Sequence, residues 1–326
     1  MVLRSIRLWF PFLAQVLSLA VTSCVYEHED CPENLSLDIV SDWQLAPDAS
    51  PGGMAYIFFP YDGSVPWRFD FIGNLAGKVT LPVGTYSFLS YNDDTASVIF
   101  SEDSGYDGYE ATTADADSPD ASCHGERSGD RVLRTPDMLW GCAYGYVDLW
   151  YDGVRHTVLG TDKSDSGSVF SPGFILTALQ RPLTAHYTFR IEDVRNLSGV
   201  RSMSATLSGM AGSLSLASGV KGRYPSTLLL KVKGLDSETI GGDFYTFGIP
   251  SEPEAPNILS LYVVIKDGRR FCYKFDVSPQ VRDAPDPMEV TLILRGLTIE
   301  PPSEGDETGF DITVDGWETV IVNIKD

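Results

Sequence analysis

The sequence predicts an all-β protein made of two tandem β-sandwich domains with Greek-key connections. Three observations support this fold class. No long stretch combines a helical hydrophobic period with an N-terminal cap. Residues 183–191 alternate apolar and polar side chains without interruption, which is typical of a strand with one face in a core. Short β-prone runs are separated by turns rich in Gly, Asn, Asp and Pro, as in sandwich folds.

The N-terminus has the pattern of a secretory signal peptide. Two arginines precede an apolar run at residues 8–20, and small residues lead to Cys24. The run is shorter than the roughly 20 apolar residues of a membrane-spanning helix. Residues 21–24 resemble a bacterial lipobox, whose cysteine is acylated before the chain is cut in front of it. We therefore predict a signal peptide over residues 1–23 and lipid attachment at Cys24. An ordinary signal with a later cleavage site is the alternative.

The excess of acidic over basic residues limits the classes of molecule that the chain can bind. The chain has 24 Lys and Arg against 45 Asp and Glu, a formal net charge of -21. Such a surface repels phosphates, so nucleic acid is excluded, and an anionic lipid surface is disfavoured. Membrane attachment must then come from the lipid on Cys24. The lipidated tether spans residues 24–34, and its acidic start resembles a surface-export signal of Bacteroidetes lipoproteins, with a merely solvated tether as the alternative.

We place the N-terminal sandwich at residues 35–161. Its expected strands are residues 35–39, 54–61, 67–71, 78–81, 85–91, 96–100, 138–140, 144–151 and 154–159. Residues 101–137 are rich in Ser, Asp, Gly, Thr and Ala and predict a long loop, which inside a compact domain is usually functional or mobile. Residues 162–167 have the composition of a linker.

The C-terminal sandwich is expected at residues 168–300. Its expected strands are residues 183–191, 202–207, 212–216, 227–233, 244–249, 259–266, 269–277 and 289–294. Asp267 and Gly268 predict a hairpin with a type I′ turn. Residues 301–326 form a C-terminal linker followed by an alternating segment, 310–324, which is either a last strand or an extension. Its side chains include Phe310, Ile312, Val314 and Trp317.

Four cysteines remain beside Cys24, and in an oxidising compartment they allow three pairings. We favour a disulfide between Cys123 and Cys142, because these two residues flank one loop. Cys272 lies in a strand-like run and is expected to be a buried thiol.

No catalytic or cofactor motif is present. The sequence has neither a metalloprotease H-E-x-x-H nor a G-x-S-x-G nucleophile elbow, and it has no phosphate-binding glycine loop. We therefore predict that the chain is not an enzyme and binds no metal or cofactor. Asn92, Asp93 and Asp94 have oxygen ligands for Ca²⁺ but lack the spacing of a calcium loop, so we interpret them as a turn.

Several aromatic side chains outside obvious core positions can stack on sugars. They are Trp67, Tyr106, Tyr109, Trp140, Trp150 and Tyr151. At alternating strand positions such residues usually belong to the core, which is the alternative interpretation.

Short motifs along nearly the whole chain resemble one family. They include Arg68-Phe69-Asp70-Phe71, Leu81-Pro82, Tyr91-Asn92, Arg181-Pro182-Leu183, residues 207–213 and residues 309–317. With the lipoprotein start, they resemble Bacteroidales fimbrillin-like lipoproteins, similar to FimB-type accessory and anchor subunits of fimbriae. The resemblance implies two transthyretin-like sandwich domains and a role in anchoring, nucleating or tipping a fimbrium at the outer membrane, with the cell surface as the expected location.

The expected partners are fimbrial subunits, because subunits of this kind join by strand addition. Residues 310–324 are the terminal segment suited to be donated, whereas a last strand docked on its own sheet is the alternative. A glycan- or host-ligand-binding outer-membrane lipoprotein is the competing function.

Overall fold

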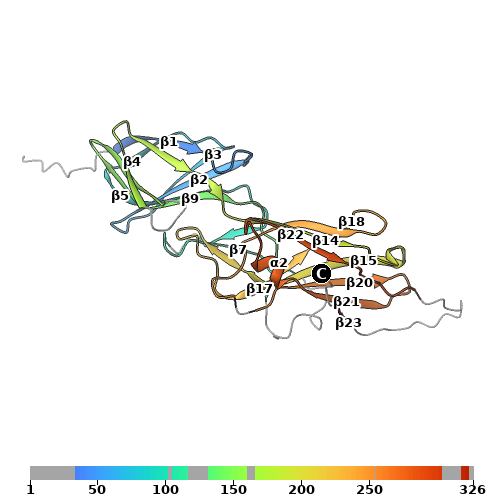
Figure 1. Ribbon diagram of the computed structural model, residues 1–326. Helices are drawn as coiled ribbons and strands as arrows, with labels where there is room; N and C mark the ends of the chain where they lie inside the picture. Colours follow the sequence, from blue (N-terminus) through green and yellow to red (C-terminus); the bar gives the residue numbers. More distant parts are fainter. Residues whose placement is uncertain are drawn as a thin grey trace, which may run out of the picture.

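The computed structural model describes residues 34–101, 105–116, 131–159, 166–253, 255–302 and 317–322. Strands dominate these ranges, which contain one short α-helix, α2 (Ser278–Arg282), and a 3₁₀ turn at Leu197–Gly199. The predicted all-β class is confirmed. The body is elongated, with the N-terminal sheets towards one end and the C-terminal sheets towards the other (Figure 1).

The N-terminal half consists of two sheets that share one core. The smaller sheet has the order β12 (Ile175–Leu179), β1 (Asn34–Asp42), β4 (Lys78–Pro82). The larger sheet has the order β11 (Ser166–Ser171), β10 (Gly153–Leu159), β9 (Trp140–Trp150), β5 (Gly84–Asn92), β2 (Gly53–Pro60), β3 (Trp67–Ile72), with β13 (Arg181–Pro182) paired to β9. Buried side chains of both sheets form the core, among them Leu37, Tyr56, Phe58, Phe88, Tyr144 and Leu176.

The strand β12 joins the N-terminal sheets although it follows the linker predicted at residues 162–167. It pairs in parallel with β1, and Leu176 and Ala178 enter the core beside Leu37. A change of composition can mark a loop, but it does not show which sheet the next strand joins. The division into two domains and their transthyretin-like topology stay predictions.

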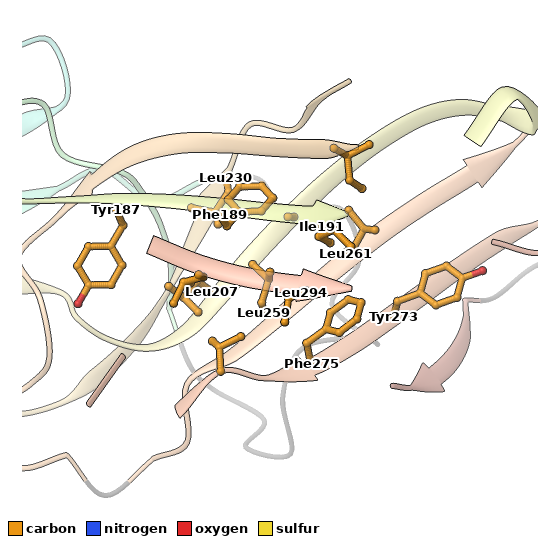
Figure 2. Packing of buried hydrophobic residues seen from close by; sticks show 14 of the residues in the cluster. Tyr187, Phe189, Ile191, Leu207, Leu230, Leu259, Leu261, Tyr273, Phe275 and Leu294 are labelled. Atoms are coloured by element: carbon orange, nitrogen blue, oxygen red, sulfur yellow. The ribbon is translucent and has the colours of Figure 1, made fainter. Parts of the chain in front are cut away.

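The C-terminal half also has two sheets around one core. One sheet has the order β18 (Lys233–Gly234), β19 (Ile240–Thr246), β14 (Ala185–Glu192), β22 (Glu289–Arg295). The other has the order β23 (Glu318–Ile321), β21 (Arg270–Asp276), β20 (Ile258–Ile265), β15 (Val200–Ala211), β17 (Pro225–Leu230), β8 (Val132–Arg134). Figure 2 shows Tyr187, Phe189 and Ile191 of β14 in this core. They are buried and the polar residues between them are not, so the predicted alternation is confirmed.

The predicted hairpin at Asp267 and Gly268 is present between β20 and β21, but its turn differs from type I′. The Ile265 amide donates to Arg269 O at 3.0 Å and the Gly268 amide donates to Ile265 O at 3.0 Å. Gly268 alone in this loop has a positive φ, +92°. These bonds define a three-residue loop with glycine in the left-handed position, the other common hairpin connection.

The segment predicted as a loop at residues 101–137 connects the two halves. β7 (Glu110–Thr113) pairs with β6 (Val98–Phe100) and with β16 (Ser213–Ser215) of the C-terminal half. β8 adds in parallel to β17. A third core lies at this junction, where Ile57 and Leu89 meet Leu214 and Phe247. The described parts of the segment, 105–116 and 131–137, are therefore structural connectors.

Candidate functional site

An open groove of about 820 Å³ lies where the β2–β3 turn, residues 105–107 and β9 come together. Tyr61 is held beside it, because its hydroxyl donates to Gly145 O at 2.5 Å and its amide donates to Thr85 O at 3.0 Å. The Tyr61 side chain is nevertheless 60% exposed. Ser87 also donates to Gly145 O, at 3.1 Å.

The opposite wall of the groove contains Tyr106 and Asp107. The Tyr106 ring meets Phe59 edge to face, with 5.7 Å between ring centroids. Burial raises the pKa of the Tyr106 hydroxyl, with a smaller contribution from the Asp107 carboxylate, so this hydroxyl stays protonated. The groove thus combines fixed aromatic rings with hydroxyl and carboxylate groups.

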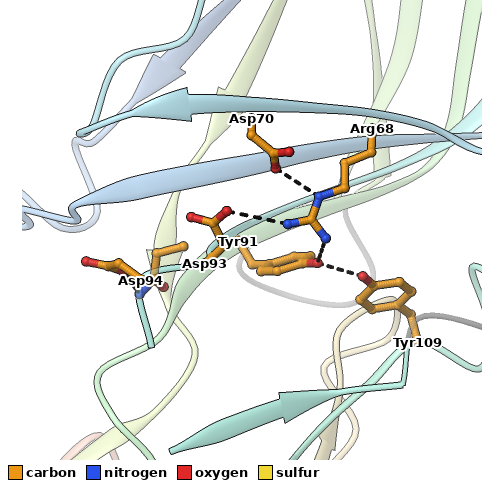
Figure 3. Close-up of polar contacts among 7 residues, drawn as sticks. Arg68, Asp70, Tyr91, Asp93, Asp94 and Tyr109 are labelled. Carbon is orange, nitrogen blue, oxygen red and sulfur yellow. Dashed lines mark hydrogen bonds and ion pairs between the residues drawn. The ribbon is translucent and has the colours of Figure 1, made fainter. Parts of the chain in front are cut away.

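A second polar cluster surrounds Arg68 (Figure 3). The Arg68 guanidinium contacts Asp70 at 2.8 Å, Asp93 at 3.4 Å and the Tyr91 hydroxyl at 3.2 Å. The Tyr91 hydroxyl also bonds the Tyr109 hydroxyl at 2.6 Å. The cluster holds β3, β5 and the segment before β7 together, which is a structural role.

The oxygen atoms of the acidic turn at Asn92 and Asp94 bind the protein's own amides. Asp94 accepts from the Gly52 amide at 2.5 Å and from the Asn92 side chain at 2.8 Å. The Asn92 side chain accepts from the Trp140 amide at 2.7 Å. Among the described residues, no group of three or more His, Cys, Asp or Glu side chains is placed to hold a metal ion.

The predicted strand-exchange segment is described only in part. Phe310, Ile312 and Val314 lie outside the described residues. Trp317 and β23 dock on their own sheet, where β23 pairs in parallel with residues 271–274 of β21. The Trp317 ring meets Tyr262 edge to face, with 5.2 Å between centroids.

The structure shows one member of the predicted disulfide. Cys142 is buried in the N-terminal core, with Sγ 3.3 Å from Ser90 Oγ, and it forms no disulfide with another described cysteine. Burial raises the pKa of this thiol to about 11. Cys123 and the lipid-attachment residue Cys24 lie outside the described residues, so the pairing and the lipid stay predictions. Cys272 is buried in β21, as expected.

The aromatic residues predicted for sugar stacking differ in burial and in their position relative to the groove. Tyr109 is 1% exposed and cannot present its ring to a ligand. Trp67 lies on the edge strand β3, outside the groove, whereas Tyr106 lines it. Sequence reasoning missed Tyr61, because a tyrosine directly after a strand of apolar residues has the pattern of a core residue.

No helix within the described ranges is long and apolar enough to cross a membrane.

Comparisons with known proteins agree with the predicted resemblance. A Bacteroides ovatus protein named "Putative fimbrium anchoring subunit Fim4B" is 27% identical over 140 residues, which is 42% of this chain and 40% of that protein. The chain therefore matches less than half the length of this relative. The match confirms the resemblance to Bacteroidales fimbrial anchor proteins.

A solved structure shares the fold. The crystal structure of a "putative adhesin" from Bacteroides ovatus covers 83% of this chain and 94% of its own, at 17% identity and a TM-score of 0.60. The fimbrial anchor protein Mfa2 from Porphyromonas gingivalis covers 81% of this chain and 90% of its own, at 15% identity and a TM-score of 0.48. A family model described as "Domain of unknown function (DUF5119)" matches residues 23–231, so the chain belongs to the DUF5119 family.

Proposed function

We propose that this chain is a non-catalytic accessory subunit of a fimbrium, held at the outer membrane by a lipid on Cys24. The similarity to a protein named for fimbrium anchoring supports the fimbrial role. The lipid, the outer-membrane attachment and the exposure at the cell surface rest on the lipobox pattern and the acidic tether.

The main structural support for this role is the way in which two edge strands, β12 and β22, are closed. The Tyr144 hydroxyl donates to Thr177 O at 2.6 Å and accepts from the Leu179 amide at 3.1 Å, on the free side of β12. On β22, the Gln280 side chain both donates to Ile293 O, at 3.0 Å, and accepts from the Ile293 amide, at 2.8 Å. Side chains that bind the outward-facing backbone in this way prevent another chain from pairing there.

On the other sheet of the C-terminal half, β21 is covered only by the edge strand β23, and this cover is weaker. Its cover, β23, has four residues, and Glu318, Thr319 and Ile321 are exposed. The indole N–H of Trp317 is buried without a hydrogen-bond partner among the described residues, which lowers the stability of the docked state. A cover of four mostly exposed residues can leave, and β21 then offers a backbone edge to a strand of a neighbouring subunit. Alternatively, residues 310–324 are themselves donated to that neighbour.

The strand β1 connects the tether to the body in a way that suits an anchor. It directly follows the tether and is the central strand of its sheet, hydrogen-bonded to β4 on one side and to β12 on the other. Leu37 and Ile39 bury it in the N-terminal core. A force applied through the lipid is therefore resisted by the backbone hydrogen bonds of β1 to β4 and β12 and by the packing of the N-terminal core.

Deletion of residues 303–326 in the bacterium that makes the chain tests the fimbrial role. Fimbriae are isolated, and the amount of the chain in them is measured by quantitative immunoblot. We expect a change of several-fold, a loss if the tail is donated and a gain if it covers an acceptor edge. An unchanged amount contradicts strand addition. Trp150→Ala, a substitution of an exposed tryptophan outside the deleted segment, is the control, and urea unfolding verifies that each variant is folded.

A separate variant tests the lipid. Cys24→Ala should move the chain from the outer-membrane fraction to the soluble fraction, whereas retention in the membrane fraction would contradict lipid anchoring.

A further inference from the structure

We propose that the groove between Tyr61 and Tyr106 is a binding site for a neutral carbohydrate. The site lies on the N-terminal half and does not involve β21 or β23. Its function is therefore independent of strand addition, and either proposal can fail alone.

The aromatic side of the groove is rigid before any ligand arrives. The hydroxyl of Tyr61 is bound to Gly145 O, and its ring meets Tyr146 edge to face, with 6.4 Å between centroids. A tyrosine that is already fixed in place but 60% exposed can contact the apolar face of a sugar ring with little further loss of side-chain entropy.

The polar groups of the opposite wall are available to a ligand. Neither the Tyr106 hydroxyl nor the Asp107 carboxylate has a hydrogen-bond partner among the described residues, and Asp107 is exposed. A protonated phenol donates and a carboxylate accepts, so the pair can bind two hydroxyl groups of one sugar. A purely apolar ligand would offer a hydrogen-bond partner to neither group.

The floor of the groove is open at Gly145. A Cβ atom added there would meet only the Tyr106 hydroxyl within 4 Å, at 3.9 Å. The backbone of Gly145 does not have the positive φ that would demand glycine. A larger side chain at this position can therefore occupy the groove without straining β9, which provides a direct test.

The charge of the groove selects against anionic ligands. Asp107 lines it, whereas no Lys or Arg among the described residues does, and the whole chain has a net charge of -21. Phosphorylated, sulfated or sialylated glycans would be repelled. The volume of about 820 Å³ lies within the usual range for ligand sites and is open enough for an oligosaccharide.

The test is a glycan array probed with the whole mature chain. The array contains neutral oligosaccharides of galactose, mannose and N-acetylglucosamine, each beside its sialylated form, and hits are titrated by calorimetry. We expect binding to at least one neutral oligosaccharide and weaker binding to its sialylated form. Tyr61→Ala and Gly145→Val should abolish this binding, and Tyr106→Phe should weaken it about tenfold through the loss of one hydrogen bond.

Tyr151→Ala is the matched control, because Tyr151 is 58% exposed but does not line the groove. Thermal unfolding shows whether each variant keeps its fold, and Gly145→Val keeps the test valid if Tyr61→Ala does not. The proposal is overturned by absence of binding to every neutral oligosaccharide at millimolar concentration. It is also overturned by binding that Gly145→Val leaves unchanged, or by preference for the sialylated forms.

Discussion

Replacing Trp317 with alanine should release β23 while the rest of the chain stays folded. Two contacts of the Trp317 ring set the magnitude. The edge-to-face pair with Tyr262 contributes about 0.5–1.5 kcal/mol. The Arg270 guanidinium, 6.0 Å from the ring centroid, contributes about 0.5–1 kcal/mol. Together they predict a loss of about 1–2.5 kcal/mol of docking free energy, which corresponds to a shift of about 5- to 70-fold in the docking equilibrium.

Hydrogen exchange measures this shift locally. The Val322 amide donates to Lys274 O at 3.0 Å and is protected only while β23 is docked. In Trp317→Ala, exchange in the peptide that contains residues 317–322 should accelerate by the same factor, whereas the urea midpoint of the whole chain should not move. Trp150→Ala should change neither quantity.

Two results would refute this reasoning about Trp317. Unchanged exchange in residues 317–322 would mean that other contacts hold β23. A urea midpoint lowered in proportion to the faster exchange would mean that β23 belongs to the cooperative core and is not a removable cover.

Further predictions concern buried groups. Burial lowers the pKa of His156 below its ordinary 6.5, so the fold keeps this ring neutral while the unfolded chain takes up a proton. The unfolding free energy should therefore fall as pH drops through about 6.5. His156→Phe should reduce this pH dependence, as urea titrations at pH 7.5 and 5.5 would show. Leu214→Ala should lower the unfolding free energy by about 2–5 kcal/mol, because Leu214 is 3% exposed in the junction core. A loss below about 1 kcal/mol would show that the stability of the two halves does not depend on this core. In the reduced chain, the Cys142 thiol, with its pKa raised to about 11, should react with iodoacetamide only after unfolding, as peptide mapping would show. Tyr144→Phe should cost about 1–3 kcal/mol in chemical unfolding, because two backbone groups of β12 lose their partner.

Much of the fold is predictable from local pattern. The alternation around Phe189 identifies a strand and its buried face, and Asp267-Gly268 identifies a hairpin. The pattern could not specify the type of turn at Gly268, because that depends on the register with which β20 and β21 pair.

Long-range pairing was not predictable. β7 has few apolar residues and β8 is only three residues long, and both pair with strands far along the chain, β16 and β17. The parallel pairing of β12 with β1 likewise joins two segments that lie far apart in the sequence. Composition alone therefore favours a loop where the structure has a connector between the two halves.

The positions of single residues in the groove also depend on contacts between distant segments, which the local sequence does not predict. Tyr106 was identified because it is aromatic in a polar segment, whereas Tyr109, three positions later, is buried against Tyr91. Tyr61 acquires its place from a hydrogen bond to Gly145, a contact between distant segments that no local pattern encodes.

We propose that a fimbrial neighbour pairs with the chain along the edge made by β21 and β23, and photo-crosslinking at this edge tests the pairing directly. A photo-crosslinking amino acid is placed at Lys274, the β21 residue that lies opposite Ile321 in the docked state. Irradiation of bacteria with assembled fimbriae should then link the chain covalently to a fimbrial subunit. A crosslink found only within the chain itself, between β21 and β23, would contradict the claim.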